Sequence, residues 1–202
     1  GTVIDGTNAL GKLFSIKEGQ AENVLLENGG QLTVVDGTTA SGTTIRDSGM
    51  QTVKSGGTAT GTIIESGGLQ TVYAGGKAGD TIINEGGLMQ NAGGEDSGTT
   101  VKNGGIYEIV FAPYTDYTTR ASDLTVEAGG RAEVYAGTLT GATVSGANAS
   151  LTLMTIIDDK EMNLVFPSLT GQVSVTEGGR LVSQRGADMS GAELTLSSQG
   201  GL

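Results

Sequence analysis

The densest group of side chains that could do chemistry is acidic, with Asp158, Asp159 and Glu161 close together beside Lys160. Clustered carboxylates serve as acids, bases and Ca²⁺ ligands in enzymes that cleave polysaccharides. Such an active site needs further carboxylates from neighbouring strands, and none recur at a matching position in the adjoining repeats. We therefore interpret the segment as a solvated loop, and whether Asp158–Glu161 binds a cation stays open.

Composition argues against most other catalytic chemistry. The chain has no histidine and no cysteine, so the usual nucleophilic triads, thiolate metal sites and disulfides are excluded. Its glycines do not open a helix, as those of a phosphate-binding loop do. The sequence thus predicts that the chain is not an enzyme and needs no metal or cofactor.

The overall charge limits the possible partners. The formal net charge is −11 and the pI is about 4.3, so the surface repels nucleic acid and anionic lipid. No stretch approaches the roughly 18 apolar residues of a membrane-spanning helix, so we expect no direct membrane insertion. No signal peptide is evident and the first residues already follow the repeat, so we expect a mature fragment of a longer protein.

The elements that would position any site come from a repeat. Glycine makes up 36 of 202 residues, and Gly-Gly pairs close short runs rich in Ile, Val and Thr. Leu26, Ile45, Ile64 and Ile83 are spaced by 19 residues, Val101 follows after 18, and Val34, Val53 and Val72 repeat the spacing of 19. Runs this short are typical of strands, and a fixed period is typical of a solenoid. The sequence predicts an all-β parallel β-helix with rungs of about 19 residues, where a rung is one turn of the chain.

The alternation of strand side chains assigns faces to the predicted rungs. Beside the aliphatic residues, the expected interior contains Thr43, Thr62, Thr81 and Thr99, with Ala40, Ala59 and Ala78 at the corner of a third, shorter side. Gly-Gly is expected to supply the positive φ of each corner. Outward positions on successive rungs are Arg46, Glu65, Asn84 and Lys102, with Arg46 beside Glu65 as an exposed ion pair. This row is either a solvated face or a recognition surface.

Two inserts interrupt the pattern and contain both prolines. Proline cannot donate a hydrogen bond to a β-ladder, so these segments should leave the stack as loops or hairpins. We expect one continuous solenoid with regular rungs in residues 1–110, an inserted loop in 111–122, rungs in 123–153, a second insert in 154–170 and rungs in 171–202. The opening segment TNALGKLFSIKEGQAEN would form an irregular rung.

The segment LGKLFSIKEGQAENVLLENGGQLTVVDGTTASGTTIRDSG, followed by SGGTATGTIIESGGLQTV, resembles the passenger of self-associating autotransporter adhesins, the group of AIDA-type adhesins and antigen 43. The resemblance is close over residues 10–110 and looser beyond. It implies a right-handed β-helix at the bacterial cell surface, anchored through a C-terminal outer-membrane barrel outside this sequence. It also implies aggregation, biofilm formation and adhesion. Several members are O-heptosylated on Ser or Thr, which makes a heptosyltransferase a possible partner and Thr39, Ser41, Thr58 and Thr60 possible acceptors.

Three functions stay open after this resemblance. In the first, the chain associates with copies of itself on neighbouring cells through its outward ladders, with Arg46, Asp47, Glu65, Asn84 and Lys102 as candidates. In the second, Tyr114, Asp116 and Tyr117 of the first insert bind a host protein or glycan, unless Phe111 and Tyr114 simply fold back over an exposed rung. In the third, the chain is a rigid β-helical spacer that displays such a loop. We expect the first, and a polysaccharide-degrading enzyme is the least favoured.

Overall fold

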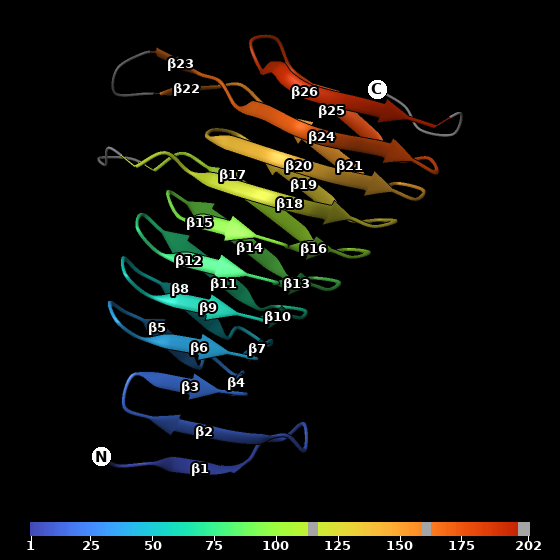
Figure 1. Cartoon of the computed structure of the whole chain (residues 1–202). Coiled ribbons are helices and arrows are strands. Elements are labelled where there is room, and N and C mark those ends of the chain that lie inside the picture. Colours follow the sequence, from blue (N-terminus) through green and yellow to red (C-terminus); the bar gives the residue numbers. More distant parts are fainter. Residues whose placement is uncertain (113–116, 159–162, 198–202) are drawn as a thin grey trace.

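The structure is a computed structural model, and it describes residues 1–112, 117–158 and 163–197. This part of the chain contains strands and turns but no helix. Successive turns of the chain stack into a parallel β-solenoid, with the amino-terminal end at the bottom of Figure 1 and the carboxyl-terminal end at the top. The predicted all-β solenoid is therefore confirmed.

Each regular rung contributes three strands. The first arm comprises β3 (Gln20–Glu22), β6 (Thr39–Ser41), β9 (Thr58–Thr60), β12 (Lys77–Gly79) and β15 (Glu95–Ser97). The second arm comprises β4 (Leu25–Leu26), β7 (Thr44–Ile45), β10 (Ile63–Ile64), β13 (Ile82–Ile83) and β16 (Thr100–Val101). The eight-stranded sheet on the opposite side comprises β5 (Gln31–Val34), β8 (Met50–Val53), β11 (Leu69–Tyr73), β14 (Leu88–Ala92), β17 (Ile106–Val110), β19 (Arg131–Val134), β21 (Ser150–Leu153) and β25 (Arg180–Ser183).

Further along the chain the two arms are replaced by single long strands. These are β18 (Arg120–Val126), β20 (Thr138–Ser145), β24 (Ser168–Thr176) and β26 (Asp188–Leu196). Strand β18 pairs with both β15 and β16. The arms and the long strands therefore belong to one large sheet. The alanines expected at the corner of a third side are the central residues of the first arm.

Equivalent residues of successive rungs stack directly on one another. Ile64 pairs in register with Ile45 below and Ile83 above, and Val72 pairs with Val53. Parallel strands lie about 4.8 Å apart, so each rung covers the apolar face of the one before it. Ile45, Ile64 and Ile83 are fully buried as predicted, and each such side chain contributes roughly 1.5–3 kcal/mol to stability. The predicted inward threonines and alanines are buried too.

The interior of the regular rungs also contains amide side chains that the repeat pattern did not predict. Gln51 and Gln70 are fully buried, and both donate through Nε2 to the Thr62 hydroxyl, at 3.3 and 3.2 Å. The Thr81 hydroxyl in turn donates to Gln70 Oε1 at 3.3 Å. Buried polar groups are costly without partners, so this ladder accounts for Thr62, Gln70 and Thr81. Thr43 Oγ1 and Gln51 Oε1, in contrast, have no partner among the described residues.

The two glycines of a corner have different tasks. The first, such as Gly67, has a φ of 78°, which glycine adopts without steric cost. The second, Gly68, does not have positive φ, but a Cβ there would lie 2.4 Å from the carbonyl oxygen of Ile45 on the preceding rung. The prediction that Gly-Gly supplies positive φ is therefore right for the first glycine and wrong for the second, which permits close backbone contact between rungs.

The opening segment is not the irregular rung expected from the sequence. β1 (Ile4–Thr7) pairs antiparallel with β2 (Leu13–Lys17), and β2 pairs antiparallel with β3. A tight turn makes this possible, because Asn8 Oδ1 accepts hydrogen bonds from the backbone nitrogens of Leu10 and Lys12. The resulting hairpin covers the lower end of the stack in Figure 1.

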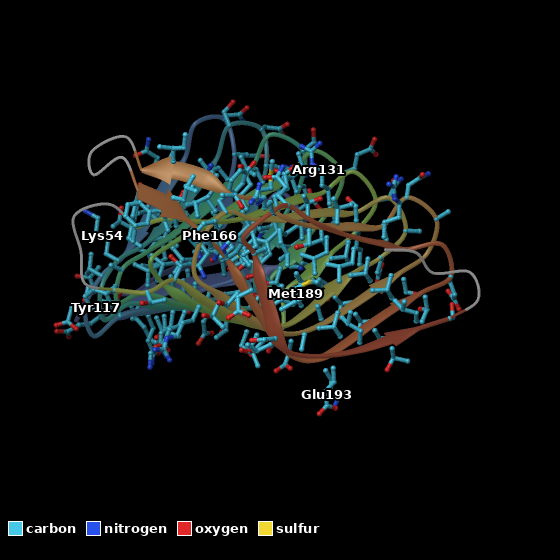
Figure 2. All side chains as sticks on the ribbon, turned by 90° about the horizontal axis from the view of Figure 1, so that it is seen from above. Lys54, Tyr117, Arg131, Phe166, Met189 and Glu193 are labelled. Atoms are coloured by element: carbon cyan, nitrogen blue, oxygen red, sulfur yellow. The ribbon has the colours of Figure 1, made fainter. Side chains whose placement is uncertain are left out.

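The two interruptions of the repeat differ in structure. In 154–170, β22 (Ile156–Asp158) and β23 (Asn163–Val165) form an antiparallel hairpin, and β24 begins already at Ser168. Figure 1 shows this hairpin projecting from the side of the stack. In 111–122, Ala112 is buried, residues 113–116 lie outside the described chain, and β18 begins at Arg120. Seen along the stack in Figure 2, Tyr117 and Lys54 lie at the same outer edge.

Candidate functional site: a charged edge of the solenoid

A row of polar side chains follows the second arm where each rung turns toward the eight-stranded sheet. We call this row the charged ladder; it comprises Glu27, Arg46, Glu65, Asn84, Lys102 and Glu127. Each residue comes directly after the inward-facing residue that ends its strand, so its side chain faces outward. Backbone hydrogen bonds fix the spacing, since the nitrogens of Glu65 and Asn84 donate at 2.8 Å to the carbonyls of Ile45 and Ile64. The four outward residues expected from the sequence therefore do form one row.

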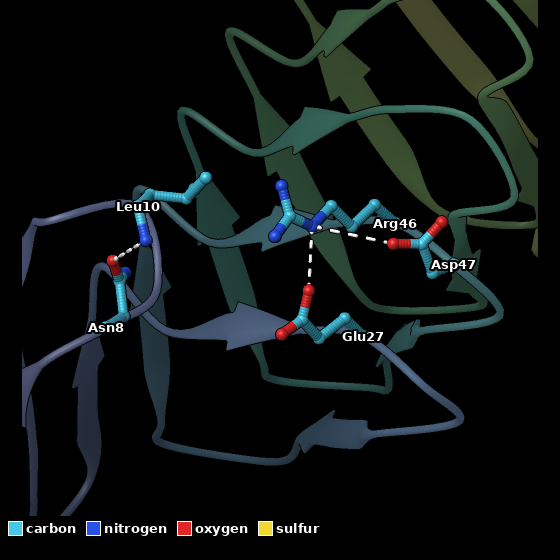
Figure 3. Close-up of polar contacts among 5 residues, drawn as sticks. All are labelled: Asn8, Leu10, Glu27, Arg46 and Asp47. Atoms are coloured by element: carbon cyan, nitrogen blue, oxygen red, sulfur yellow. Dashed lines mark hydrogen bonds and ion pairs between the residues drawn. The ribbon is translucent and has the colours of Figure 1, made fainter.

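The lower end of the charged ladder holds an ion pair that differs from the expected one. Arg46 Nε lies 2.8 Å from Glu27 Oε2 and 3.7 Å from Asp47 Oδ2 (Figure 3). The hydrogen bond to Glu27 is the largest cause that raises the pKa of Arg46, with Glu65 a minor one. The predicted Arg46–Glu65 pair is thus wrong. Glu27 occupies the same position one rung below and is the neighbour that the guanidinium contacts.

The upper part of the charged ladder is open to new partners. Glu65 and Asn84 are half-buried, and Lys102 and Glu127 are exposed. Within the described part of the chain, Glu65, Lys102 and Glu127 make no ion pair. Arg46 uses only Nε for its two contacts, so the outer face of its guanidinium fork can still donate to a carboxylate.

Isoleucine side chains border the charged ladder. Ile63 and Ile82 are outward residues of β10 and β13, on the two rungs that carry Glu65 and Asn84, and both are half-buried. The corner on the other side of the ladder carries Asp47, which is exposed and has a φ of 47°. The centre of the ladder therefore combines charged groups with partly exposed apolar area, as interaction surfaces often do.

The four possible acceptor hydroxyls lie on a different face. Thr39 pairs in register with Thr58, and Ser41 with Thr60, on the first arm. All four side chains face outward because Ala40 and Ala59 between them face the interior. They form a compact hydroxyl surface on the outside of two successive rungs.

Two other groups of candidates lie mainly outside the described residues. Tyr114 and Asp116 do so entirely, as do residues 159–162 of the acidic segment. Tyr117 is described and 57% exposed, so it does not fold back into the core. Two residues further on, Thr119 is buried and donates its hydroxyl to the Val110 carbonyl at 2.7 Å.

A buried acid lies at a position that the sequence pattern did not single out. Asp96 occupies the inward position of the alanines in the first arm, and its Oδ2 accepts hydrogen bonds from Thr99 Oγ1 at 2.6 Å and Tyr107 Oη at 2.7 Å. Oδ1 has no partner among the described residues. Burial raises the pKa of Asp96 to about 6, although both hydrogen bonds act to lower it. Asp96 lies 18 residues after Ala78 and pairs with it in register, as Val101 does with Ile83, so aligning this shorter rung on Val101 would have revealed the acid.

The described residues show neither of two other kinds of site. Among them, no three acidic side chains gather closely enough to hold a metal ion. They also include no helix long and apolar enough to cross a membrane.

Comparison with known proteins gives consistent results. A family model described as "Adhesin of bacterial autotransporter system, probable stalk" matches residues 5–68 and 62–105, together half of the chain. The chain is 32% identical over 201 residues to the probable autotransporter YpjA of Escherichia coli strain K12, covering 99% of this chain but 10% of that protein. It is 35% identical over 86 residues to the uncharacterized protein YdhQ of Escherichia coli O157:H7, covering 41% of this chain and 20% of that protein. The chain thus spans only a small part of these relatives.

A solved structure shares the fold. The crystal structure of the TibC-catalyzed hyper-glycosylated TibA55-350 fragment matches with a TM-score of 0.51 over 90% of this chain and 80% of that one. Sequence identity between the two is 24%. At this identity the likeness supports the solenoid architecture alone.

Proposed function

Because the chain belongs to the family of bacterial autotransporter adhesin stalks, we propose that it is a surface passenger segment that associates with a second copy of itself through the charged ladder. The observation that carries this proposal is the order of charges on successive rungs. Membership of the family supports a cell-surface or extracellular passenger. Anchoring through an outer-membrane barrel, aggregation and biofilm formation are further parts of the proposal, and we assign the segment no catalytic role.

The charges of the ladder are complementary to those of a second, antiparallel copy when both are centred on one particular residue. Two antiparallel copies related by a twofold axis through Asn84 would place Glu65 opposite the second copy's Lys102, and Arg46 opposite its Glu127. Each contact occurs twice by symmetry. A twofold axis through Glu65 or Lys102 would bring identical charges together, and an axis between Asn84 and Lys102 would oppose Glu65 to Glu127. An axis between Arg46 and Glu65 would give two opposite-charge contacts instead of four, so Asn84, which is uncharged, is the favoured centre.

The strength of this contact follows from its exposure. Exposed ion pairs contribute about 0.2–1 kcal/mol each, so four of them give a weak association. The half-buried Ile63 and Ile82 beside Asn84 add apolar area to the same contact. On two cell surfaces many such contacts act together, and multivalency makes weak contacts effective. Exposed charges are screened by salt, so the association should weaken as ionic strength rises.

Sedimentation velocity across protein concentration, at low and high salt, tests this proposal. We expect a salt-sensitive monomer–dimer equilibrium. Glu65→Lys should abolish the dimer by opposing two cations, Lys102→Glu should do the same with two anions, and the double variant should restore it. Glu22→Lys, with the same charge change on the exposed outer face of β3, is the matched control.

Two outcomes would contradict self-association through this surface. One is a monomer at every concentration, and the other is a dimer that the charge reversals leave unchanged. Either would favour the alternative of a rigid spacer that displays a loop able to bind a host protein or glycan. The observation in favour of that alternative is the exposed Tyr117 at the end of the first insert.

We also propose that the hydroxyl surface of Thr39, Ser41, Thr58 and Thr60 is a substrate for a heptosyltransferase. What supports this is the outward, in-register placement of the four side chains. Mass spectrometry of the protein from its native host would detect added heptose. Unmodified peptides from this region would exclude it.

A further inference from the structure

The outer face of the first arm is hollowed next to the first insert. A groove of about 690 Å³ lies over β12, β15, β18 and β20, and its lining includes Lys77, Glu95 and Arg120 together with the hydroxyl groups of Ser97, Ser122 and Thr140. A second hollow of about 540 Å³ adjoins it and shares Lys77, Glu95, Thr118 and Arg120 with it. Tyr117 lines the second hollow. The two hollows form one depression, which we call the arm groove.

The insert creates the wall of the arm groove. Thr119 is anchored by its hydroxyl to the Val110 carbonyl at 2.7 Å, and the Thr138 nitrogen donates to the Thr119 carbonyl at 3.0 Å. The next residue, Arg120, is held by its nitrogen to the Gly94 carbonyl at 3.0 Å. These bonds fix the point where the chain returns to the sheet, directly after Thr118 and Tyr117 of the wall.

Three charges lie in line on the floor of the arm groove. Lys77, Glu95 and Arg120 pair in register on successive rungs, so the two cations are about 10 Å apart with a carboxylate between them. All three side chains are exposed. In the described part of the chain neither cation makes an ion pair, even with Glu95. In a protein of net charge −11, two unpaired cations in one depression provide a place where an anion can be held, although Asp96 also lines the groove.

We propose that the arm groove binds an acidic oligosaccharide, a chain of pyranose rings that bear carboxylates. Arg120 would hold one carboxylate through its guanidinium fork and Lys77 a second one further along the chain. Glu95 would accept hydrogen bonds from sugar hydroxyls, and the serine and threonine hydroxyls would both donate and accept them. Tyr117 offers an exposed ring on which the apolar face of a sugar can pack.

Other classes of ligand fit the arm groove less well. An extended peptide binds a β-sheet by adding to an unpaired edge, but β12, β15, β18 and β20 are each paired on both sides. Nucleic acid extends its charge well beyond the two cations of the groove, so the net negative charge repels it more strongly than a short acidic sugar chain. A sugar chain needs no strand edge, and its repeat along the chain is similar in length to the spacing of the rungs.

This proposal does not depend on self-association, because the arm groove and the charged ladder use different residues. Isothermal titration calorimetry can therefore be done in the Glu65→Lys background, whatever that change does to the dimer. The probe is tetragalacturonate, and maltotetraose is the neutral control of the same length. We expect heat from tetragalacturonate alone, with affinity that falls as salt rises.

Substitutions on the floor of the arm groove give the second readout. Arg120→Gln and Lys77→Gln should each weaken tetragalacturonate binding about tenfold, the effect of losing one charge-assisted contact. Lys54→Gln removes another exposed cation that does not line the groove and should leave the affinity unchanged. Unchanged circular dichroism would show that each variant is folded.

Three results would overturn the proposal. They are no heat at millimolar tetragalacturonate, equal binding of maltotetraose, and equal weakening by Lys54→Gln and Arg120→Gln, which would mean that binding follows overall charge. None of these results bears on the sedimentation experiment. The two proposals can therefore fail separately.

Discussion

The rungs below β18 and the rungs from β18 onward enclose different interiors. Below, the rows that face inward include Thr99 and Gln70, and their hydroxyl and amide groups are buried in hydrogen bonds. Above, Leu124 takes the Thr99 position and Leu151 lies in the row of Gln70, both fully or almost fully buried. The same backbone path thus accommodates a mixed polar core and an aliphatic one.

The difference shows what strict repetition makes possible. A buried glutamine is stable only when a partner lies at the right height on the next rung. Equal spacing of 19 residues provides this for both amide atoms of Gln70 and for Nε2 of Gln51, whereas Gln51 Oε1 has no partner among the described residues. Where inserts interrupt the period, such partners are no longer guaranteed, and aliphatic side chains pack without directional demands.

The largest effect on stability is expected when a core side chain of either region is truncated, and it tests whether the two regions unfold separately. Ile64→Ala and Leu151→Ala should each lower the free energy of unfolding by about 2–5 kcal/mol, because both side chains are fully buried. Rungs contact only their neighbours, so Leu151→Ala should speed hydrogen exchange in β19, β21 and β25 but not in β8 and β11. Equal loss of protection in both regions would show that the solenoid unfolds as one unit.

The next effect concerns Asp96, the acid within the polar core. Its pKa of about 6 in the folded state exceeds the ordinary value of 3.8, so folding favours the protonated form. The contribution of Asp96 to stability is therefore fully present below pH 4 and is lost as pH rises through about 6. Across this window the free energy of unfolding falls by about 3 kcal/mol. Asp96→Ala introduces the alanine that the other rungs of the first arm have at this position. It should remove this part of the pH dependence in urea unfolding. A variant with the wild-type pH profile would contradict the assignment.

A smaller effect is expected from the amide ladder. Gln70→Leu deprives the Thr81 hydroxyl of its partner and should cost about 1–3 kcal/mol in urea unfolding. Adding Thr81→Val removes the unpaired hydroxyl, so the double variant should recover much of the loss. If the double variant were the less stable of the two, the hydrogen bonds would not be the reason for the polar core.

The smallest effect distinguishes the two corner glycines. Gly29 has a φ of 81°, and a Cβ added there would meet no other atom of the described chain within 4 Å, so Gly29→Ala should cost only the backbone strain of about 1–2 kcal/mol. Gly68→Ala should cost more, since its Cβ would lie 2.4 Å from the Ile45 carbonyl oxygen. Thermal unfolding of the two variants measures the difference, and equal losses would refute the separate roles.

The sequence by itself determined the period, the inward aliphatic rows and the outward row that became the charged ladder. These follow from local rules: alternation along a strand, and glycine where the chain turns. The resemblance of residues 10–110 to autotransporter adhesins agrees with the family that the comparison found. The expected Arg46–Glu65 pair failed because periodicity gives two equivalent neighbours, above and below, and does not say which one a flexible side chain contacts.

Only the tertiary structure decided the features that depend on contacts between rungs. The antiparallel hairpin β1–β2 depends on how Asn8 closes its turn. The second glycine of a corner is required by a carbonyl oxygen of the preceding rung, as Ile45 requires Gly68. The arm groove exists because Thr119 returns the insert beside Lys77, Glu95 and Arg120. Distances in the sequence do not contain this information, because the stacking of rungs sets which residues meet.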